Sequence, residues 1–328
     1  MNNQQKGSAI LWIIIVIILI LVFAGGYFYL AQKKTPQSQV TTFDDSDMRV
    51  SEPTIPQAEN SALDLASMTT VSISTSSALQ LVNSAAQKPY FYCDLQSANQ
   101  QTTCNLSSAR TIANLAVAQS DVLYKQGNTD AALAGVFNVL DLGQKVENNS
   151  DALITYLVGV AVKKSALTEI EKIVQSDKLT SSEKITYNQR LSQDTDDVTG
   201  LQNSFKFEYQ QTIPAINEIS TGNYDPSTGL DKQLFDAYEK AKTSYTWNPV
   251  ETQQMIYTAF KTYVQDSALA CGTPALPIQK IDATTLPTSV ENYEGKIFYA
   301  IGTPSLGNVR TTTVCALLPL YQTIESTL

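Results

Sequence analysis

The stretch YKQGNTDAALAGVFNVLDLG, residues 124–143, joins two segments in which small and apolar residues recur with helical spacing. Upstream, from about Leu106, alanines and Ile112 recur at intervals of three and four residues, which is typical of one helix face. Gly127-Asn128 is a turn signal, and a second apolar stripe begins after Thr129. Because helices joined by so short a turn pack antiparallel, the sequence predicts a helical hairpin within an all-α fold.

The same region, about residues 111–144, resembles a single tetratricopeptide-repeat hairpin. Gly127 and Ala132 stand at the turn and small-residue positions of such a repeat. The sequence departs from the repeat at Ala116, where a large aromatic residue is expected, and no second copy follows about 34 residues later. The resemblance therefore implies one hairpin in an irregular helical bundle and does not imply a repeat array.

Other helix signals follow along the chain. The run ALITYLVGVAV, residues 152–162, is apolar on nearly every side, which predicts a central helix from Asp151 to about Ser176. Thr180 and Glu183 match a capping box, and Asn248-Pro249 marks another helix start. Residues 296–315 are rich in β-branched side chains; we prefer helices there, with a small β-hairpin as the alternative.

Residues 8–30, SAILWIIIVIILILVFAGGYFYL, predict a transmembrane anchor. The run carries no charge after Ser8, and about 20 apolar residues are enough for a helix to cross a hydrocarbon core of about 30 Å. A cleavable signal usually has a shorter apolar region, although Val22-Phe23-Ala24 provides a cleavage site that keeps this alternative open. We expect residues 1–7 to stay in the cytoplasm and the C-terminal body to lie outside.

Lys6-Gly7 before this apolar run resembles the start of type IV prepilins, in which a peptidase cuts after such a glycine. Members of that family typically carry a glutamate five residues after the cut, and Trp12 stands there in this chain. The resemblance implies a filament subunit processed after Gly7, which we keep as a second alternative function.

The region after the anchor divides into a predicted stalk and a predicted body. Residues 31–60 are rich in Gln, Ser, Thr and Asp and contain three prolines, so we expect a flexible stalk. Asp44, Asp45 and Asp47 lie in it, where we expect them to serve solubility. Residues 61–328 form one extracytoplasmic helical domain, whose arrangement, with Asn292 to Lys296, resembles uncharacterised exported bacterial helical proteins of no known activity.

Charge and cysteine content limit the partners of this chain. With 22 basic and 31 acidic residues the net charge is -9, so the basic surface that nucleic-acid binding requires is missing. Histidine is absent, which excludes a mixed cysteine and histidine zinc site. The four cysteines instead favour disulfides in an oxidising compartment, Cys93 with Cys104 and Cys271 with Cys315, although four cysteines allow three connectivities.

The motifs that could carry catalysis are incomplete. Ser181 and Lys184 have S-x-x-K spacing, but the other motifs of penicillin-recognising enzymes do not follow, and a helix cap explains the same residues. The carboxylates of residues 194–197 lack the glycine and glutamate of a calcium loop and are interpreted as a solvated helix end. We therefore assign no catalytic residue, metal ligand or cofactor.

Aromatic residues supply the candidate binding surface. Tyr90, Phe91 and Tyr92 lie in a predicted loop beside Cys93, where rings could contact a protein or a glycan. Aromatics at helical spacing, such as Tyr209 and those of residues 257–263, are interpreted as core. The predicted function is a membrane-anchored extracytoplasmic binding or scaffold protein at a bacterial surface. The first alternative is a carboxylate-dependent hydrolase or transferase, whose chemistry needs only two acidic residues.

Overall fold

The computed structural model describes 11 stretches of the chain. They are residues 43–51, 54–66, 73–93, 105–150, 152–176, 179–193, 198–220, 247–282, 285–287, 289–303 and 306–328. Within these stretches, no helix combines the length and the apolar character needed to cross a bilayer. The predicted anchor, residues 8–30, lies outside them.

The described residues confirm the all-α prediction. Their elements are helices, and the only β-type pairing among them is an isolated bridge between Asn60 and Tyr90. The chain divides into two compact units, each made of separate segments. Of the described residues, those within 43–50, 205–266 and 274–308 form the first unit, and those within 51–204, 267–273 and 309–328 form the second.

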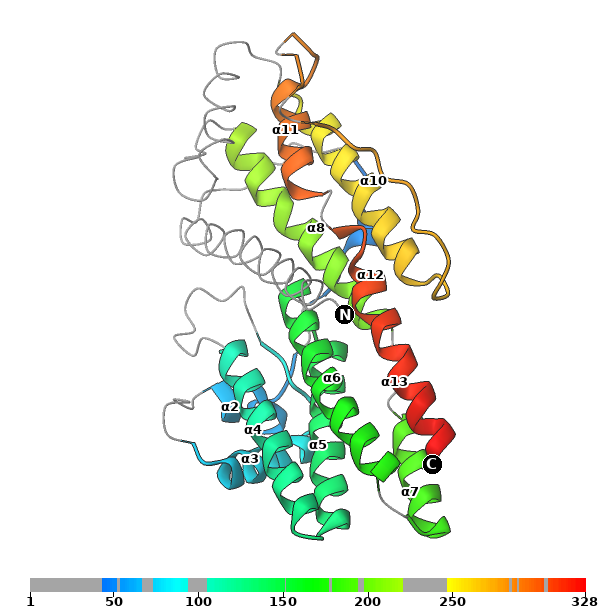
Figure 1. Ribbon diagram of the computed structural model, residues 1–328. Coiled ribbons are helices and arrows are strands. Elements are labelled where there is room, and N and C mark those ends of the chain that lie inside the picture. Colours follow the sequence, from blue (N-terminus) through cyan, green and yellow to red (C-terminus); the bar gives the residue numbers. More distant parts are fainter. Residues whose placement is uncertain are drawn as a thin grey trace. The chain divides into compact units, whose positions relative to one another are not determined.

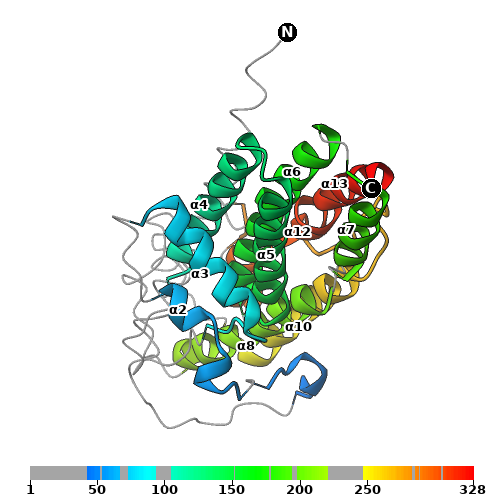
Figure 2. The same ribbon diagram turned by 90° about the horizontal axis from the view of Figure 1, so that it is seen from below.

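Most of the described helices belong to the second unit, and α2 to α7, α12 and α13 are labelled in Figure 1. They are η2 (Gln57–Glu59), α2 (Ala62–Ala66), α3 (Thr75–Gln87), α4 (Leu106–Lys125), α5 (Thr129–Asn148), α6 (Leu153–Ser176), α7 (Ser181–Gln193), α12 (Val309–Thr312) and α13 (Val314–Thr327). The predicted hairpin is α4 and α5, and Gly127 at their turn has a φ of 83°, a conformation that favours glycine. Figure 2 shows α3 beside this pair, as its contacts with both helices require.

The predicted central helix is α6, which packs against α4, α5 and α13. Its closest approach is to α5, at Gly143 and Gly159. A Cβ at Gly159 would lie 2.7 Å from Cγ of Glu147, and one at Gly143 would lie 2.7 Å from Cγ of Lys163. These two glycines therefore allow the helices to approach until Glu147 and Lys163 meet between them.

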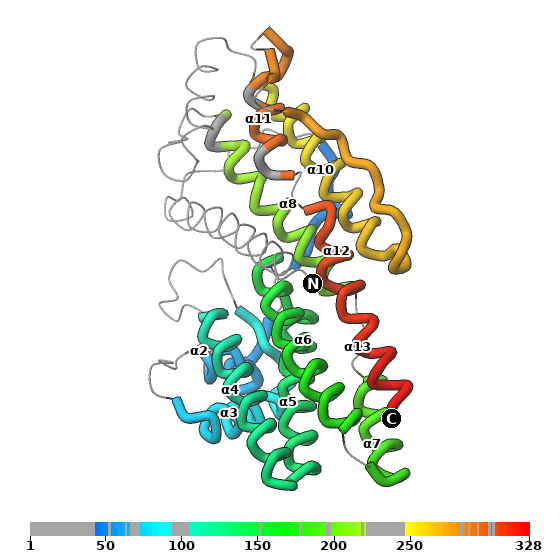
Figure 3. Tube along the Cα trace, in the orientation of Figure 1, coloured from blue at the N-terminus to red at the C-terminus, as the bar shows by residue number. Residues whose placement is uncertain are grey.

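The first unit is built around α8 (Val198–Ser220) from Phe205 onward, α10 (Pro249–Ser267) and α11 (Tyr293–Gly302), which are neighbours in Figure 3. Aromatic rings hold α8 to α10: the rings of Phe205 and Tyr263 stack with centroids 5.3 Å apart, and those of Tyr209 and Phe260 lie 6.3 Å apart. Tyr209, Phe260 and Tyr263 are buried as predicted, whereas Tyr257 is only half-buried.

Two predicted helix starts are confirmed by their hydrogen bonds. The backbone N–H of Glu251 donates to Oδ1 of Asn248 at 3.1 Å, which caps α10. At α7 the backbone N–H of Thr180 donates to Glu183 Oε2 at 2.6 Å, and that of Glu183 donates to Thr180 Oγ1 at 3.3 Å. This reciprocal pair is the predicted capping box.

The β-hairpin alternative for residues 296–315 is wrong for the described part of that region. Most of its described residues belong to the end of α11, to α12 and to the start of α13. Ile297 and Val309 are buried there, so the packing of an apolar helix face outweighs the β preference of the branched side chains.

The predicted stalk also needs correction. Residues 43–50 of the predicted stalk belong to the first unit, where Met48 is 1% exposed and Asp45 is 7% exposed. Asn60, at the predicted end of the stalk, is likewise buried, and its side chain bonds the backbone of Tyr92. Composition alone suggested a solvated chain because most of the buried groups here are polar and their partners lie far away in the sequence.

Candidate functional site

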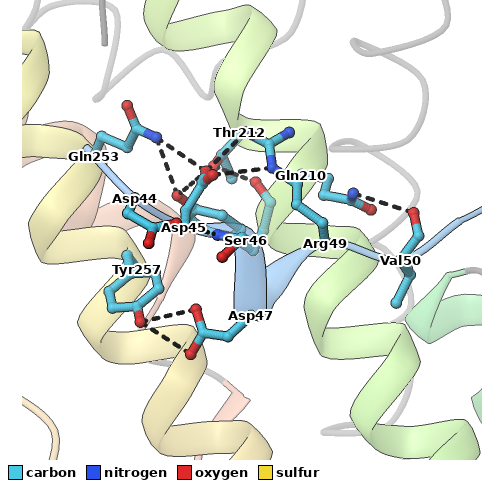
Figure 4. Close-up of polar contacts among 11 residues, drawn as sticks. Asp44, Asp45, Ser46, Asp47, Arg49, Val50, Gln210, Thr212, Gln253 and Tyr257 are labelled. Atoms are coloured by element: carbon cyan, nitrogen blue, oxygen red, sulfur yellow. Dashed lines mark hydrogen bonds and ion pairs between the residues drawn. The ribbon is translucent and has the colours of Figure 1, made fainter. Parts of the chain in front are cut away.

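The most connected polar site in the first unit lies where residues 43–50, called the N-terminal segment below, pass across α8 and α10 (Figure 4). A short 3-10 helix, η1 (Ser46–Met48), shapes this segment. It forms because the N–H of Ser46 donates to Asp44 Oδ1 at 3.1 Å and the N–H of Met48 donates to the carbonyl of Asp45 at 2.9 Å. The turn buries both Asp45 and Met48.

The centre of the site is the Asp45 network, formed by Asp45, Arg49, Tyr209 and Gln253. Arg49 donates to both carboxylate oxygens of Asp45, from Nε at 3.1 Å and from Nη2 at 2.8 Å. The hydroxyl of Tyr209 on α8 donates to Asp45 Oδ2 at 2.7 Å, and Gln253 Nε2 on α10 donates to the same oxygen at 3.2 Å. The network thus joins three parts of the chain, with Asp45 and Gln253 separated by 208 residues.

The Asp45 carboxylate has little accepting capacity left for a hydrogen bond from a ligand. An ionised carboxylate offers about four acceptor sites, and four side-chain N–H and O–H donors already point at this one. Burial, together with the neighbouring Asp45, raises the pKa of Tyr209, so its hydroxyl stays protonated and continues to donate. This arrangement suits a permanent attachment of the segment to α8 and α10.

A second, more exposed set of contacts extends the attachment along α10. The hydroxyl of Tyr257 donates to Asp47 at 2.9 Å, and Lys261 Nζ lies 2.8 Å from the same carboxylate. The hydrogen bond from Lys261 holds the pKa of Asp47 below its ordinary value. Phe43 adds an edge-on contact with the Tyr257 ring, with centroids 5.0 Å apart. The N-terminal segment is therefore fastened at both a buried and an exposed position.

From the sequence we expected Asp44, Asp45 and Asp47 to be solvated, whereas Asp45 is buried. A run of three aspartates in a polar, proline-containing stretch is typical of solvated chain, and the pairing of Asp45 with Tyr209 spans 164 residues. The available signal was the tyrosine itself, because a Tyr on a buried helix face needs a partner for its hydroxyl.

The predicted binding residues Tyr90, Phe91 and Tyr92 do not share one surface. Phe91 is fully buried, while Tyr90 is 36% exposed. Their backbone is held by the segment before α2: the N–H of Ser61 donates to the carbonyl of Tyr90 at 2.9 Å, and the N–H of Tyr92 donates to Asn60 Oδ1 at 2.9 Å. Of the three, Tyr90 offers the most exposed ring for a ligand.

One of the two predicted disulfides is described completely. Cys271 and Cys315 are joined, with Cα atoms 5.5 Å apart, and link the loop after α10 to α13. Cys93 also takes part in a disulfide, and its predicted partner Cys104 lies outside the described residues. Beside Cys271, the buried guanidinium of Arg310 donates to three carbonyls of the same loop, those of Leu269 (2.8 Å), Ala270 (3.0 Å) and Thr273 (2.7 Å).

The remaining sequence candidates have structural roles or fall outside the described residues. Lys184 donates to the carbonyl of Thr327 at 2.6 Å, so it is engaged with the C-terminal end of α13. The acidic residues 194–197 are not described. Within the described ranges, no group of three or more Cys, Asp or Glu side chains is close enough to hold a metal ion.

A buried ion pair lies in the second unit, between α5 and α6. Lys163 Nζ is 2.9 Å from Glu147 Oε2 and 3.0 Å from Gln144 Oε1. The side chain of Lys163 is 0% exposed and that of Glu147 is 6% exposed, while the Tyr321 ring of α13 lies 5.7 Å from the ammonium. The cation is thus enclosed by a carboxylate, an amide oxygen and an aromatic face.

Comparison of the chain with protein-family models, with curated proteins and with solved structures finds no match. The two polar sites and the disulfide are therefore the observations on which a functional proposal rests.

Proposed function

We propose that this chain is a single-pass membrane protein whose helical body acts outside the cytoplasm as a binding or scaffold protein. The observation that carries the proposal is the Cys271–Cys315 disulfide, because disulfides persist in oxidising compartments and are rare in the cytosol. The apolar run of residues 8–30 supplies the means of holding such a body at a membrane.

The electrostatics of the described carboxylates favour this role over the hydrolase alternative. A general acid of the glycosidase type needs a carboxyl group whose pKa is raised. Three carboxyl groups in the described ranges have pKa values shifted in the opposite direction. Hydrogen bonds from Lys125 and Lys172 lower the pKa of Asp121, those from Lys261 and Tyr257 lower the pKa of Asp47, and that from the Ser46 N–H lowers the pKa of Asp44.

Labelling of cysteines in intact cells tests the location. A membrane-impermeant maleimide is applied to expressing cells before and after a membrane-impermeant reductant, with Cys271→Ser/Cys315→Ser as the matched control. We expect labelling of the wild-type chain only after reduction, without lysis, and weaker labelling of the control. Labelling that needs lysis but no reductant would place the body in the cytoplasm and overturn the proposal.

Ligand binding is tested at Tyr90, the most exposed of the three predicted binding residues. We expect Tyr90→Ala to weaken retention of the purified chain on cell-wall glycan or on surface-protein extract, whereas Ile185→Ala, which removes an exposed apolar side chain from α7, leaves it unchanged. Equal retention of both variants with the wild type would remove Tyr90 from the binding surface.

A further inference from the structure

The N-terminal segment lies between the predicted anchor and the helical body, and this position gives its attachment a mechanical meaning. Any force or restraint from residues 8–30 reaches the body through residues 31–42 and then through the N-terminal segment. A fully extended chain spans at most about 3.3–3.6 Å per residue. The point at which the chain first becomes fixed to the body therefore sets how far the body can move from the bilayer.

We propose that the Asp45 network is a tether lock that keeps the first unit close to the membrane. The proposal rests on the function proposed above. With residues 43–50 fixed on α8 and α10, residues 31–42 allow a separation of at most about 40 Å between the end of the anchor and the body. If the same chain were free as far as residue 60, the limit would rise to about 100 Å.

The contacts are suited to a lock because they combine a buried and an exposed fastening. Met48 and the Asp45 carboxylate are buried, so leaving the surface of α8 and α10 requires an apolar side chain and an ion pair to be transferred together. The carbonyl of Val50 accepts from Gln210 Nε2 at 3.3 Å and marks the C-terminal limit of the attachment. Release at Asp45 would free the segment as one piece.

Arg49 gives a direct assay, since trypsin cuts after arginine only when the surrounding backbone is locally open. Tyr209→Phe removes the hydroxyl bond to Asp45 but leaves the Asp45–Arg49 pair, and Tyr209→Phe/Gln253→Leu removes both helix-borne donors. In the purified full-length chain we expect cleavage after Arg49 to accelerate by about tenfold or more in the double variant. Tyr299→Phe is the matched control, because it removes a buried hydroxyl bonded to the Gln279 carbonyl in the same unit.

Fluorescence resonance energy transfer measures how far the first unit lies from the membrane. Thr258 on α10 is exposed, and the structure holds no free thiol among its described cysteines, so a dye on Thr258→Cys reports the first unit alone. The labelled chain is reconstituted into vesicles with acceptor lipids. We expect transfer to fall in the double variant and to stay at the wild-type level in the Tyr299→Phe control.

The possible outcomes distinguish failure of the tether lock from failure of the predicted membrane anchor. A membrane-bound double variant with accelerated cleavage and reduced transfer supports the lock. Unchanged cleavage, or unchanged transfer despite faster cleavage, in a membrane-bound and folded variant overturns it. A wild-type chain that does not associate with vesicles overturns the anchor on which the lock depends, and circular dichroism identifies a variant that has simply unfolded.

Discussion

Two buried carboxylates in this molecule are held by cations, and they differ in where their partners come from. Glu147 meets Lys163 across a turn between consecutive helices, and both side chains are almost completely shielded from water. Asp45 meets Arg49 within one short segment, but the Arg49 side chain is 47% exposed and the other donors lie on α8 and α10. The first pair is part of a helix interface, whereas the second fixes a segment to helices that are distant in the sequence.

Burial of the charge should determine what breaking each contact does. Loss of one partner in the Glu147–Lys163 pair leaves a buried charge that water cannot solvate, so the stability of the whole unit falls. Loss of a donor in the Asp45 network leaves a segment that can detach and become solvated. The first site should therefore control global stability, and the second should control local attachment.

The largest effect is expected from Lys163→Met, which leaves Glu147 buried without its cation. We expect the free energy of unfolding of the second unit to fall by about 3–5 kcal/mol, measured by urea denaturation. Lys163→Met/Glu147→Leu removes both charges and should recover most of this loss. If the single and double variants were equally unstable, charge burial would not be the cause.

A smaller effect is expected from Gly159→Ala. Its Cβ would lie 2.8 Å from the backbone nitrogen of Glu147, so α5 and α6 must separate, at a cost of about 1–3 kcal/mol in the free energy of unfolding. Gly307→Ala is the matched control, because the nearest atom to its Cβ would be Cε1 of Tyr263 at 3.9 Å. Equal melting temperatures for the two variants would contradict the close crossing.

Tyr209→Phe tests the other side of the comparison. Loss of a hydrogen bond to a buried carboxylate should cost about 1.5 kcal/mol, and the cost should appear as faster hydrogen exchange of residues 43–50. In the wild type, residues 43–50 should already exchange faster than the buried amides of α8, α10 and α11, because the segment can detach without global unfolding. Equal protection of the segment and of these helices would show that the segment is an inseparable part of the unit.

The smallest effect is expected from the exposed pair of Asp47 and Lys261 when pH is varied. Hydrogen bonding with Lys261 lowers the pKa of Asp47 below 3.8, so its contribution is lost only as pH falls through that lowered value. Bonding with Asp47 raises the pKa of Lys261 above 10.5, so its contribution is lost only as pH rises through that raised value. Cleavage after Arg49, compared in wild type and Lys261→Gln, should therefore show a constant ratio from pH 5 to pH 9. A ratio that changes within this range would implicate another group.

Local signals were sufficient to predict much of the fold. Features that depend on residues a few positions apart could be predicted. They are the hairpin of α4 and α5, the buried α6, and the caps at Asn248 and Thr180. The β-branched region of residues 296–315 left two readings open, since branched side chains suit both a strand and a buried helix face.

The candidate site was not predictable in the same way. Nothing near Asp45 indicates that its partners are Tyr209 and Gln253, because a polar segment without apolar periodicity looks the same whether it is solvated or docked. The close approach at Gly143 and Gly159 was equally hidden, since a glycine inside a helix does not reveal what packs against it. Long-range polar contacts and steric fits of this kind require the fold itself.

The position of Arg310 suggests in what order the C-terminal part of the chain matures. Its three bonds to the carbonyls of Leu269, Ala270 and Thr273 involve no sulfur, so they can form before any oxidation takes place. They gather the loop that carries Cys271 beside α13, which carries Cys315. An oxidant would then meet two thiols that are already neighbours, which favours the pairing of Cys271 with Cys315.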